Sequence, residues 1–365
     1  MPSDNVHSDA LSGPANNSSD GVQVAPPAAW HIFMGDGTRT LADLPAPPPW
    51  RRFGAAGPDP RAVHYQPEKE EVDMVNAALY LRRPLLITGK PGAGKSSLAR
   101  AVAYHLGLGP LLIWPITSRT TLNQGLYRYD AIGRLQAAAL QNEQNERALA
   151  AIRAGSPLPQ SGDSEAENGI NITRYLNLGP LGTAFASATM RVLLVDEIDK
   201  GDIDLPNDLL NIFEEGEFRI PELERLGLDQ TFAVRPDDQG SDILITGGRV
   251  HCNAFPLIVL TSNGERDFPP AFLRRCLRLN IDYPNLKRLK RIVQKQLGLD
   301  DDAMQRANSL IEEFFNRQNG TRNDMATDQL LNAVYLAMHQ EAGSKAEFLQ
   351  RLDSALREAM FEPLR

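Results

Sequence analysis

Short apolar runs alternate with amphipathic helical patterns along the middle of the chain. The apolar runs lie at Leu85–Thr88, Leu111–Ile116, Val192–Val195, Leu257–Leu260 and Leu277–Ile281. Continuous apolar runs of this kind are typical of strands that are covered on both faces, and such strands occur in parallel sheets. The pattern therefore predicts an α/β fold in which a mostly parallel sheet lies between two layers of helices.

This alternation is interrupted in two places. A stretch of about 118–190 separates the second and third predicted strands, and it contains an Ala- and Gln-rich helical pattern followed by a polar loop. Between the third and fourth strands, the segment of about 243–253 predicts a β-hairpin whose two-residue turn is Gly247-Gly248. We interpret both segments as additions to a core of residues 61–284.

The N-terminal segment, residues 1–60, is rich in Pro, Ser, Asn, Gly and Ala. Such a segment buries too little apolar surface to offset its ordering entropy, so we expect it to be mostly disordered or extended. Its aromatic residues Trp30, Phe33 and Trp50 leave two interpretations open. They either form a strap that packs on the protein's own body or belong to a partner-docking motif.

The C-terminal segment, residues 285–365, carries amphipathic helical patterns with clear stop signals and no further strand. It predicts a separate helical subdomain after the core. The basic run in its first helix, with Lys287-Arg288 and Lys290-Arg291, is interpreted as a solvated helix face rather than a partner contact.

Composition limits the class of protein. The net charge of −8 gives no support to a general nucleic-acid-binding role. Cys252 and Cys276 have neither metal-ligand spacing nor a disulfide pattern, which favours a reducing, cytoplasmic setting. The first residues lack the pattern of a secretion signal, and no apolar run approaches the ~20 residues of a membrane span. We therefore expect a cytoplasmic protein without a membrane span.

The segment GKPGAGKS, Gly89–Ser96, matches the pattern G-x-x-x-x-G-K-[ST] between a predicted strand and a predicted helix. Backbone N–H groups can surround phosphates where no Cβ obstructs them, and the start of the following helix favours negative charge. Lys95 should reach the β- and γ-phosphates, and Ser96 should offer its hydroxyl to Mg²⁺. The predicted nucleotide-binding residues are Gly89, Lys90, Pro91, Gly92, Ala93, Gly94, Lys95, Ser96 and Ser97.

A second motif, RVLLVDEIDKGD, ends a predicted strand in two adjacent acids. Asp196 would hold Mg²⁺ with Ser96, directly or through water, and Glu197 would orient the water that attacks the γ-phosphate. A direct function of Asp199 and Lys200 is left open. Together the two motifs predict Mg²⁺-dependent hydrolysis of a nucleoside triphosphate.

With these motifs the chain resembles AAA+ ATPases. The resemblance implies a P-loop NTPase core with strand order 5-1-4-3-2, a C-terminal helical lid and ATP as the nucleotide. The segment PLIVLTSNGERDFPPAFLRRCLRLNI is similar to the sensor strand and arginine-finger segment of that family. It implies that Asn263 is the sensor-1 residue and that Arg275, in preference to Arg274, reaches the nucleotide of a neighbouring subunit.

Within that family the chain is most similar to MoxR-type ATPases. The segments DEIDKGDIDLPNDLLNIFEEGEF and NLGPLGTAFASA carry this resemblance. It implies a homo-oligomeric ring, a hexamer, that remodels a protein partner as a chaperone does. It also suggests clients with von Willebrand A-type domains and a role in a bacterial conflict or defence system.

One position departs from the family pattern. The lid helix that commonly begins near a sensor-2 arginine here reads ATDQLLNAV, with Thr327 and Asp328 at its start. Arg322 lies nearby but outside the expected helix. Coupling between lid and nucleotide could therefore use another residue or a neighbouring subunit.

Two further functions compete with a remodelling ATPase. One is a nucleotide-switched scaffold with slow turnover, which the missing lid arginine favours. The other is a nucleic-acid motor or restriction-type GTPase, against which the acidic balance counts. His64, Tyr65 and Gln66 either line the base pocket or are packing residues, so the sequence alone does not select adenine over guanine.

Overall fold

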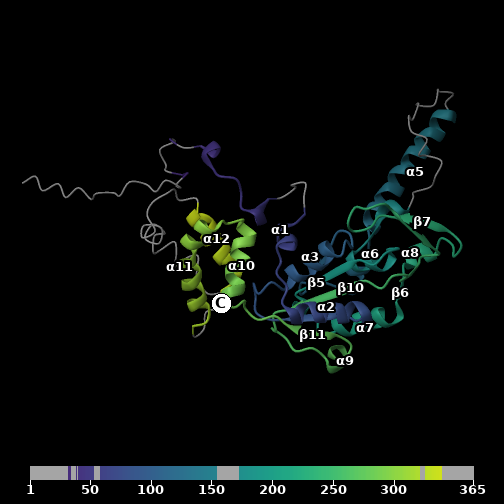
Figure 1. Ribbon diagram of the computed structural model, residues 1–365. Coiled ribbons are helices and arrows are strands. Elements are labelled where there is room, and N and C mark those ends of the chain that lie inside the picture. The colour runs from purple at the N-terminus through teal and green to yellow at the C-terminus, as the bar shows by residue number, and fades with distance from the viewer. Residues whose placement is uncertain are drawn as a thin grey trace, which may run out of the picture.

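The computed structural model describes residues 32–33, 38, 40–52, 58–153, 172–320 and 325–338. Trp30, the polar loop of the long insertion, Arg322 and the last predicted helix lie outside the described residues. The described chain forms an α/β core and a bundle of helices beside it (Figure 1).

The core is built on a five-stranded parallel sheet with strand order β11-β1-β10-β5-β2. Its strands, in chain order, are β1 (Leu85–Thr88), β2 (Leu112–Pro115), β5 (Val192–Asp196), β10 (Leu257–Ser262) and β11 (Leu277–Asn280). Each strand coincides with one of the apolar runs, and the order corresponds to the expected 5-1-4-3-2. The predicted fold class is confirmed.

Side chains of each strand alternate between two apolar cores, one on each face of the sheet. Leu85 and Ile87 of β1 belong to the core that includes side chains of helices α2 (Lys69–Leu81) and α3 (Lys95–His105). Leu86 points to the opposite core, which α6 (Pro180–Ala186) and α7 (Leu205–Glu215) help to form. Burial on both faces explains why these strands are continuous apolar runs.

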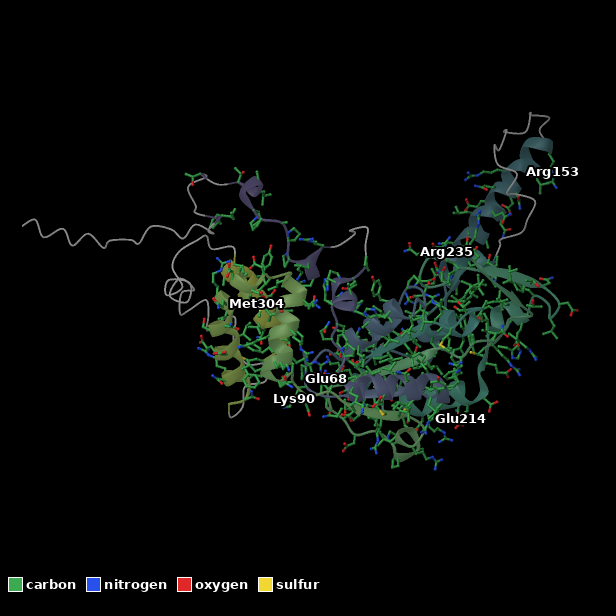
Figure 2. The ribbon with its side chains drawn as sticks, viewed as in Figure 1. Glu68, Lys90, Arg153, Glu214, Arg235 and Met304 are labelled. Carbon is green, nitrogen blue, oxygen red and sulfur yellow. The ribbon has the colours of Figure 1, made fainter. Side chains whose placement is uncertain are left out.

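The long insertion between β2 and β5 has its own small structure. It begins with α4 (Leu122–Leu126) and β3 (Tyr127–Tyr129), continues through α5 (Ala131–Arg153) and ends with the 3₁₀ turn η4 (Ile172–Tyr175) and β4 (Leu176–Leu178). β3 and β4 pair antiparallel and close the base of the insertion. Helix α5 projects away from the core, with Arg153 at its far end (Figures 1 and 2).

The predicted hairpin of about 243–253 does not form as a strand pair. Two antiparallel pairs occupy this region instead: β7 (Thr231–Val234) with β8 (Ile243–Thr246), and β6 (Glu217–Arg219) with β9 (Arg249–His251). Strands β8 and β9 follow each other in sequence, but each has a different partner. The short helix α8 (Pro221–Glu224) lies between β6 and β7 in the chain.

Gly247 and Gly248 explain why the sequence pattern was misleading. Both have positive φ, 61° and 68°, as a tight turn requires. However, a Cβ on Gly247 would lie 2.3 Å from the carbonyl oxygen of Leu228, and one on Gly248 would lie 2.6 Å from the backbone nitrogen of Glu224. The two glycines let the chain pass close to segment 224–228. Before them β8 pairs with β7, and after them β9 pairs with β6.

After β10 comes the short helix α9 (Pro270–Leu273), and after β11 the chain enters the helical bundle. The bundle consists of α10 (Leu286–Leu297), α11 (Asp301–Gln318) and α12 (Thr327–Met338), which share one apolar core. Asn285 and Asp300 cap α10 and α11 by accepting hydrogen bonds from backbone N–H groups. Among the described helices, none combines the length and apolar composition that crossing a bilayer requires.

Part of the N-terminal segment is ordered on this bundle. Residues 40–52 contain two short 3₁₀ helices, η1 (Leu41–Asp43) and η2 (Pro49–Arg51). Trp50 donates a hydrogen bond through Nε1 to Oδ1 of Asn332 on α12 at 3.1 Å, whereas Phe33 is 92% exposed. Of the two interpretations of the aromatic residues, Trp50 therefore fits the strap. The short helix α1 (Pro60–Val63) follows and packs on α3.

Candidate functional site

The glycine-rich loop connects β1 to α3 at the carboxyl edge of the sheet. Gly89, Gly92 and Gly94 have φ values of 144°, 72° and 101°, which L side chains rarely adopt. A Cβ on Gly89 would lie 2.1 Å from the carbonyl oxygen of Ile281, and one on Gly92 would lie 2.3 Å from Cβ of Ala326. The loop is therefore enclosed between the end of β11 and the start of α12, and glycine is required at both positions.

Lys95 is the first residue of α3 and is only 7% exposed. Its ammonium group donates hydrogen bonds to the carbonyl oxygens of Gly89 and Lys90, at 2.7 and 2.9 Å, and to Oδ1 of Asn263 at 2.7 Å. Burial lowers the pKa of Lys95, and nearby carboxylates oppose that shift. The loop thus holds one partly desolvated positive charge at its centre.

The two predicted acids lie at the end of β5, with Asp196 as its last residue and Glu197 directly after it. Asp196 accepts a hydrogen bond from the Ser96 hydroxyl at 2.8 Å and a second from the Thr261 hydroxyl at 2.6 Å. Glu197 has a φ of 59°, and its backbone N–H donates to the Thr261 oxygen at 2.9 Å. Thr261, in the neighbouring strand β10, therefore fixes both acids. Sequence reasoning missed it, although a threonine near the end of that apolar run was a usable signal.

Asn263 lies between the glycine-rich loop and Glu197. Its Oδ1 accepts from Lys95, and its Nδ2 donates to Oε1 of Glu197 at 3.3 Å. Lys200 donates to the other carboxylate oxygen of Glu197 at 2.8 Å. One continuous chain of side-chain hydrogen bonds thus joins Lys95 to Lys200 through the amide and the carboxylate.

Asp199 supports this series of hydrogen bonds through residues at the end of β10 and just after it. It is buried and accepts hydrogen bonds from the Ser262 hydroxyl and the backbone N–H of Asn263, both at 2.9 Å, and from the N–H of Glu265 at 3.1 Å. The carboxylate therefore holds the loop after β10 that carries Asn263.

These residues line a cleft of about 550 Å³ between the core and the helical bundle. Its lining includes residues 91–97 of the loop, Asp196, Glu197, Thr261, Asn263, His64, Tyr65 and Gln66, and from the bundle Arg288, Ile292, Gln296, Thr327, Asp328 and Leu331. The volume is within the ~300–1,000 Å³ that is usual for small-molecule sites. Gly89 and Lys90 do not line the cleft, but their carbonyl groups hold Lys95.

The cleft suits a Mg²⁺–nucleotide complex. The Ser96 hydroxyl and the Asp196 carboxylate, 2.8 Å apart, are hard oxygen donors of the kind that Mg²⁺ prefers. Successive loop residues without bulky side chains lead into the N-terminal end of α3, and Lys95 adds a cation. The residues present therefore fit both groups.

The two finger candidates lie elsewhere. Arg275 forms an ion pair with Glu214 on α7 and donates through Nη1 to the carbonyl oxygen of Ala271 at 3.3 Å, whereas Arg274 is exposed. Neither lines the cleft. Figure 2 shows Glu214 on the side of the core away from the bundle, well separated from Lys90 in the glycine-rich loop. Arg275 therefore lies far from the cleft of its own chain.

A buried ion pair joins the bundle to the core at the cleft. Arg288 of α10 donates through Nη2 to Glu71 of α2 at 2.8 Å, and the two side chains are only 9% and 4% exposed. Tyr65 donates its hydroxyl hydrogen to the same carboxylate at 3.1 Å. The basic run was predicted to be a solvated face. That interpretation is wrong for Arg288, because this side chain points from α10 into the core rather than into solvent.

Replacing Arg288 with alanine is expected to destabilise the protein by about 3–5 kcal/mol, because Glu71 would remain buried without its charged partner. Urea denaturation followed by circular dichroism measures the change in the free energy of unfolding. The matched control is Lys287→Ala, on the exposed side of the same helix. Equal stability of the two variants would contradict the importance of the pair.

Comparison with known proteins adds the following. Residues 84–276, just over half of the chain, match the family described as AAA domain (dynein-related subfamily). Domain III of the replication initiation protein DnaA from Thermotoga maritima has a similar fold, with 15% sequence identity and a TM-score of 0.40 over 85% of this chain and 100% of that one. No curated protein sequence matches the chain.

Proposed function

The chain belongs to the AAA domain family, dynein-related subfamily, and from this premise we propose that it binds ATP with Mg²⁺ in the cleft and hydrolyses it. The observation that carries the proposal is the chain of contacts from Lys95 through Asn263 to Glu197, beside the Ser96–Asp196 pair. A cation for phosphates, a metal-binding oxygen pair and a carboxylate base converge on one cleft. This is the set of groups that phosphoryl transfer to water requires.

In the proposed reaction, Lys95 binds the β- and γ-phosphate oxygens and stabilises the charge that develops there. Mg²⁺, when held by Ser96 and Asp196, would neutralise the same oxygens and aid departure of the diphosphate. Glu197 accepts a hydrogen bond from the attacking water and takes its proton. Asn263 contacts both the Lys95 ammonium and the Glu197 carboxylate. When a phosphate replaces Asn263 as the partner of Lys95, the position of Glu197 changes with it.

The direct test is Lys95→Ala. We expect its affinity for MgATP to fall by about 10- to 150-fold, because hydrogen bonds to charged groups contribute about 1.5–3 kcal/mol each. Isothermal titration calorimetry with the purified variant measures this, with Lys287→Ala as the control for loss of an exposed positive charge. Unchanged affinity in Lys95→Ala would remove the cleft as the nucleotide site.

The proposed enzyme works as a ring. Arg275 lies outside its own cleft, which supports a role as the arginine that a neighbouring subunit provides. A contact in which one surface meets a different surface of the next copy closes into a ring when its rotation permits. A hexamer follows from the resemblance to AAA+ ATPases, and we include it in the proposal.

The proposed work of the ring is to remodel a protein partner, as the resemblance to MoxR-type ATPases suggests. Support comes from α5, which projects from the core and could transmit movement to a client. Clients with von Willebrand A-type domains and a role in conflict or defence rest on that resemblance alone.

A nucleotide-switched scaffold is the second candidate, and the lid favours it. Thr327 and Asp328 line the cleft where the AAA+ pattern commonly has an arginine. Measurements of turnover and of assembly across a range of protein concentrations separate the two functions. A remodelling ATPase gains turnover per subunit as it assembles, whereas a scaffold assembles with ATP and remains slow.

A further inference from the structure

We propose that Arg51, which the N-terminal strap brings to the cleft, binds the phosphate groups of the nucleotide and supplies the cation that the start of α12 lacks. The N-terminal strap is defined here as residues 44–52. The inference rests on the proposed nucleotide site but assigns a residue outside the matched family region, which begins at residue 84.

The strap is anchored on α12 by contacts that involve two of its residues. The Trp50 indole N–H donates to Asn332 at 3.1 Å, and its ring packs edge-on against Tyr335 with centroids 6.1 Å apart. The Tyr335 hydroxyl donates to the carbonyl oxygen of Ala46. Prolines at positions 45, 47, 48 and 49 restrict the free chain, so ordering it on the lid costs less entropy than ordering a flexible segment.

The chain that follows the strap is attached to the phosphate-binding helix. Asp59 caps α1 by accepting from the backbone N–H of Arg61, and its carboxylate pairs with Arg100 of α3 at 3.4 Å. Helix α3 begins at Lys95. The strap therefore contacts the lid helix α12, the chain after it contacts α3, and both Trp50 and Arg51 line the cleft.

The cleft has several cations, but most of them are already engaged. Lys95 donates to two loop carbonyl groups and Asn263, Arg61 pairs with Asp59 at 2.9 Å, and Arg288 pairs with Glu71. Within the described residues, the Arg51 side chain has no hydrogen bond or ion pair, and it is exposed at the cleft. It is therefore available to an anionic ligand.

The acidic residues of the cleft give a further cation a function. Glu197 and Asp328 line the same cleft without a role in holding Mg²⁺, and each opposes the binding of a polyanion. Asp328 stands near the place where a lid arginine would offset that repulsion. Arginine is well suited to the task, because its planar guanidinium offers two parallel N–H donors to a phosphate group.

The neighbouring Arg52 provides a matched control. It is also exposed, but its Nε donates to the carbonyl oxygen of Pro47 at 3.2 Å, and it does not line the cleft. Two adjacent arginines of the strap thus have different surroundings. Removing either one changes the net charge equally, so only a direct contact with the nucleotide separates them.

The experiment uses the full chain and its Arg51→Ala, Arg51→Lys and Arg52→Ala variants, each titrated with MgATP and with adenosine by calorimetry. For Arg51→Ala we expect MgATP affinity to fall about 10- to 100-fold, as for the loss of a charge-assisted hydrogen bond. Adenosine affinity should stay unchanged. Arg51→Lys should restore part of the loss, and Arg52→Ala should bind as the unmodified chain does.

Equal MgATP affinities of Arg51→Ala and Arg52→Ala would overturn the proposal, as would an equal loss for adenosine, which would place the contact on the nucleoside. Asn332→Leu tests delivery by the strap: it should weaken MgATP binding as Arg51→Ala does, and unchanged binding would contradict the anchor. Failure of the unmodified chain to bind MgATP would instead refute the proposed nucleotide site itself.

Discussion

Replacing Glu197 with glutamine is expected to reduce ATP turnover by about 10²- to 10⁴-fold, the range for loss of a general base. MgATP affinity should change little, because Glu197 faces the water rather than the phosphate-binding loop in the proposed reaction. Glutamine has almost the same size, and its carbonyl oxygen can still accept a hydrogen bond from either Lys200 or Asn263, which contact different oxygens of Glu197. It cannot take a proton from water.

Release of phosphate in a steady-state assay measures turnover, and calorimetry measures affinity for the same preparation. Glu215→Gln, on the exposed end of α7, is the matched control for loss of one carboxylate. Undiminished turnover in Glu197→Gln would remove the assignment of Glu197 as the base. A parallel loss of MgATP binding would instead assign the residue to substrate binding.

The sheet could be predicted from sequence because its information is local. Each strand is a short apolar run whose side chains alternate between two cores, and both faces are covered. The strands β8 and β9 were also located near their true positions, around Gly247-Gly248. Their pairing was not, because a glycine pair that suits a two-residue turn suits equally a close passage against backbone such as that of Glu224 and Leu228.

The candidate site also has one part that local sequence motifs indicate and another part that they do not. The glycine-rich loop and the acids at the end of β5 are contiguous motifs, so the sequence alone indicates their residues. Thr261, the buried Arg288–Glu71 pair and the Trp50–Asn332 contact join segments that are far apart in sequence. Nothing in the local pattern shows that Arg288 turns into the core, since its neighbours on α10 read as an ordinary solvated basic face.

Helix α7 connects the Glu197 region of the cleft to Arg275, the arginine proposed to contact the nucleotide of the next subunit. It begins at Leu205, shortly after Glu197 and the 3₁₀ turn η5 (Ile198–Lys200), and Glu214 lies at its other end, where it pairs with Arg275. Arg83, just before β1, holds the same turn by donating to the carbonyl oxygens of Arg274 and Arg275. In the proposed ring, we expect a shift at Glu197 to move Arg275, the proposed finger, through α7.

Arg275→Ala is expected to lower turnover by about 10³- to 10⁵-fold in the assembled protein, the range for an arginine finger. MgATP affinity per subunit should remain close to that of the unmodified chain, because Arg275 does not line its own cleft. The neighbouring Arg274→Ala is the control, since Arg274 is exposed and shares the same turn. Turnover measured for both variants at equal protein concentration decides which arginine is the finger.

Mixing two inactive variants tests whether the arginine acts between subunits. Arg275→Ala keeps an intact cleft without a finger, and Lys95→Ala keeps a finger without an intact cleft. If a finger from one subunit serves the next cleft, mixed assemblies regain turnover wherever a Lys95→Ala subunit presents Arg275 to an Arg275→Ala subunit. A residue that acts only within its own chain gives no recovery. Turnover that is greatest when the two variants are mixed in nearly equal amounts would show a site shared between subunits. A mixture as inactive as its components would refute it.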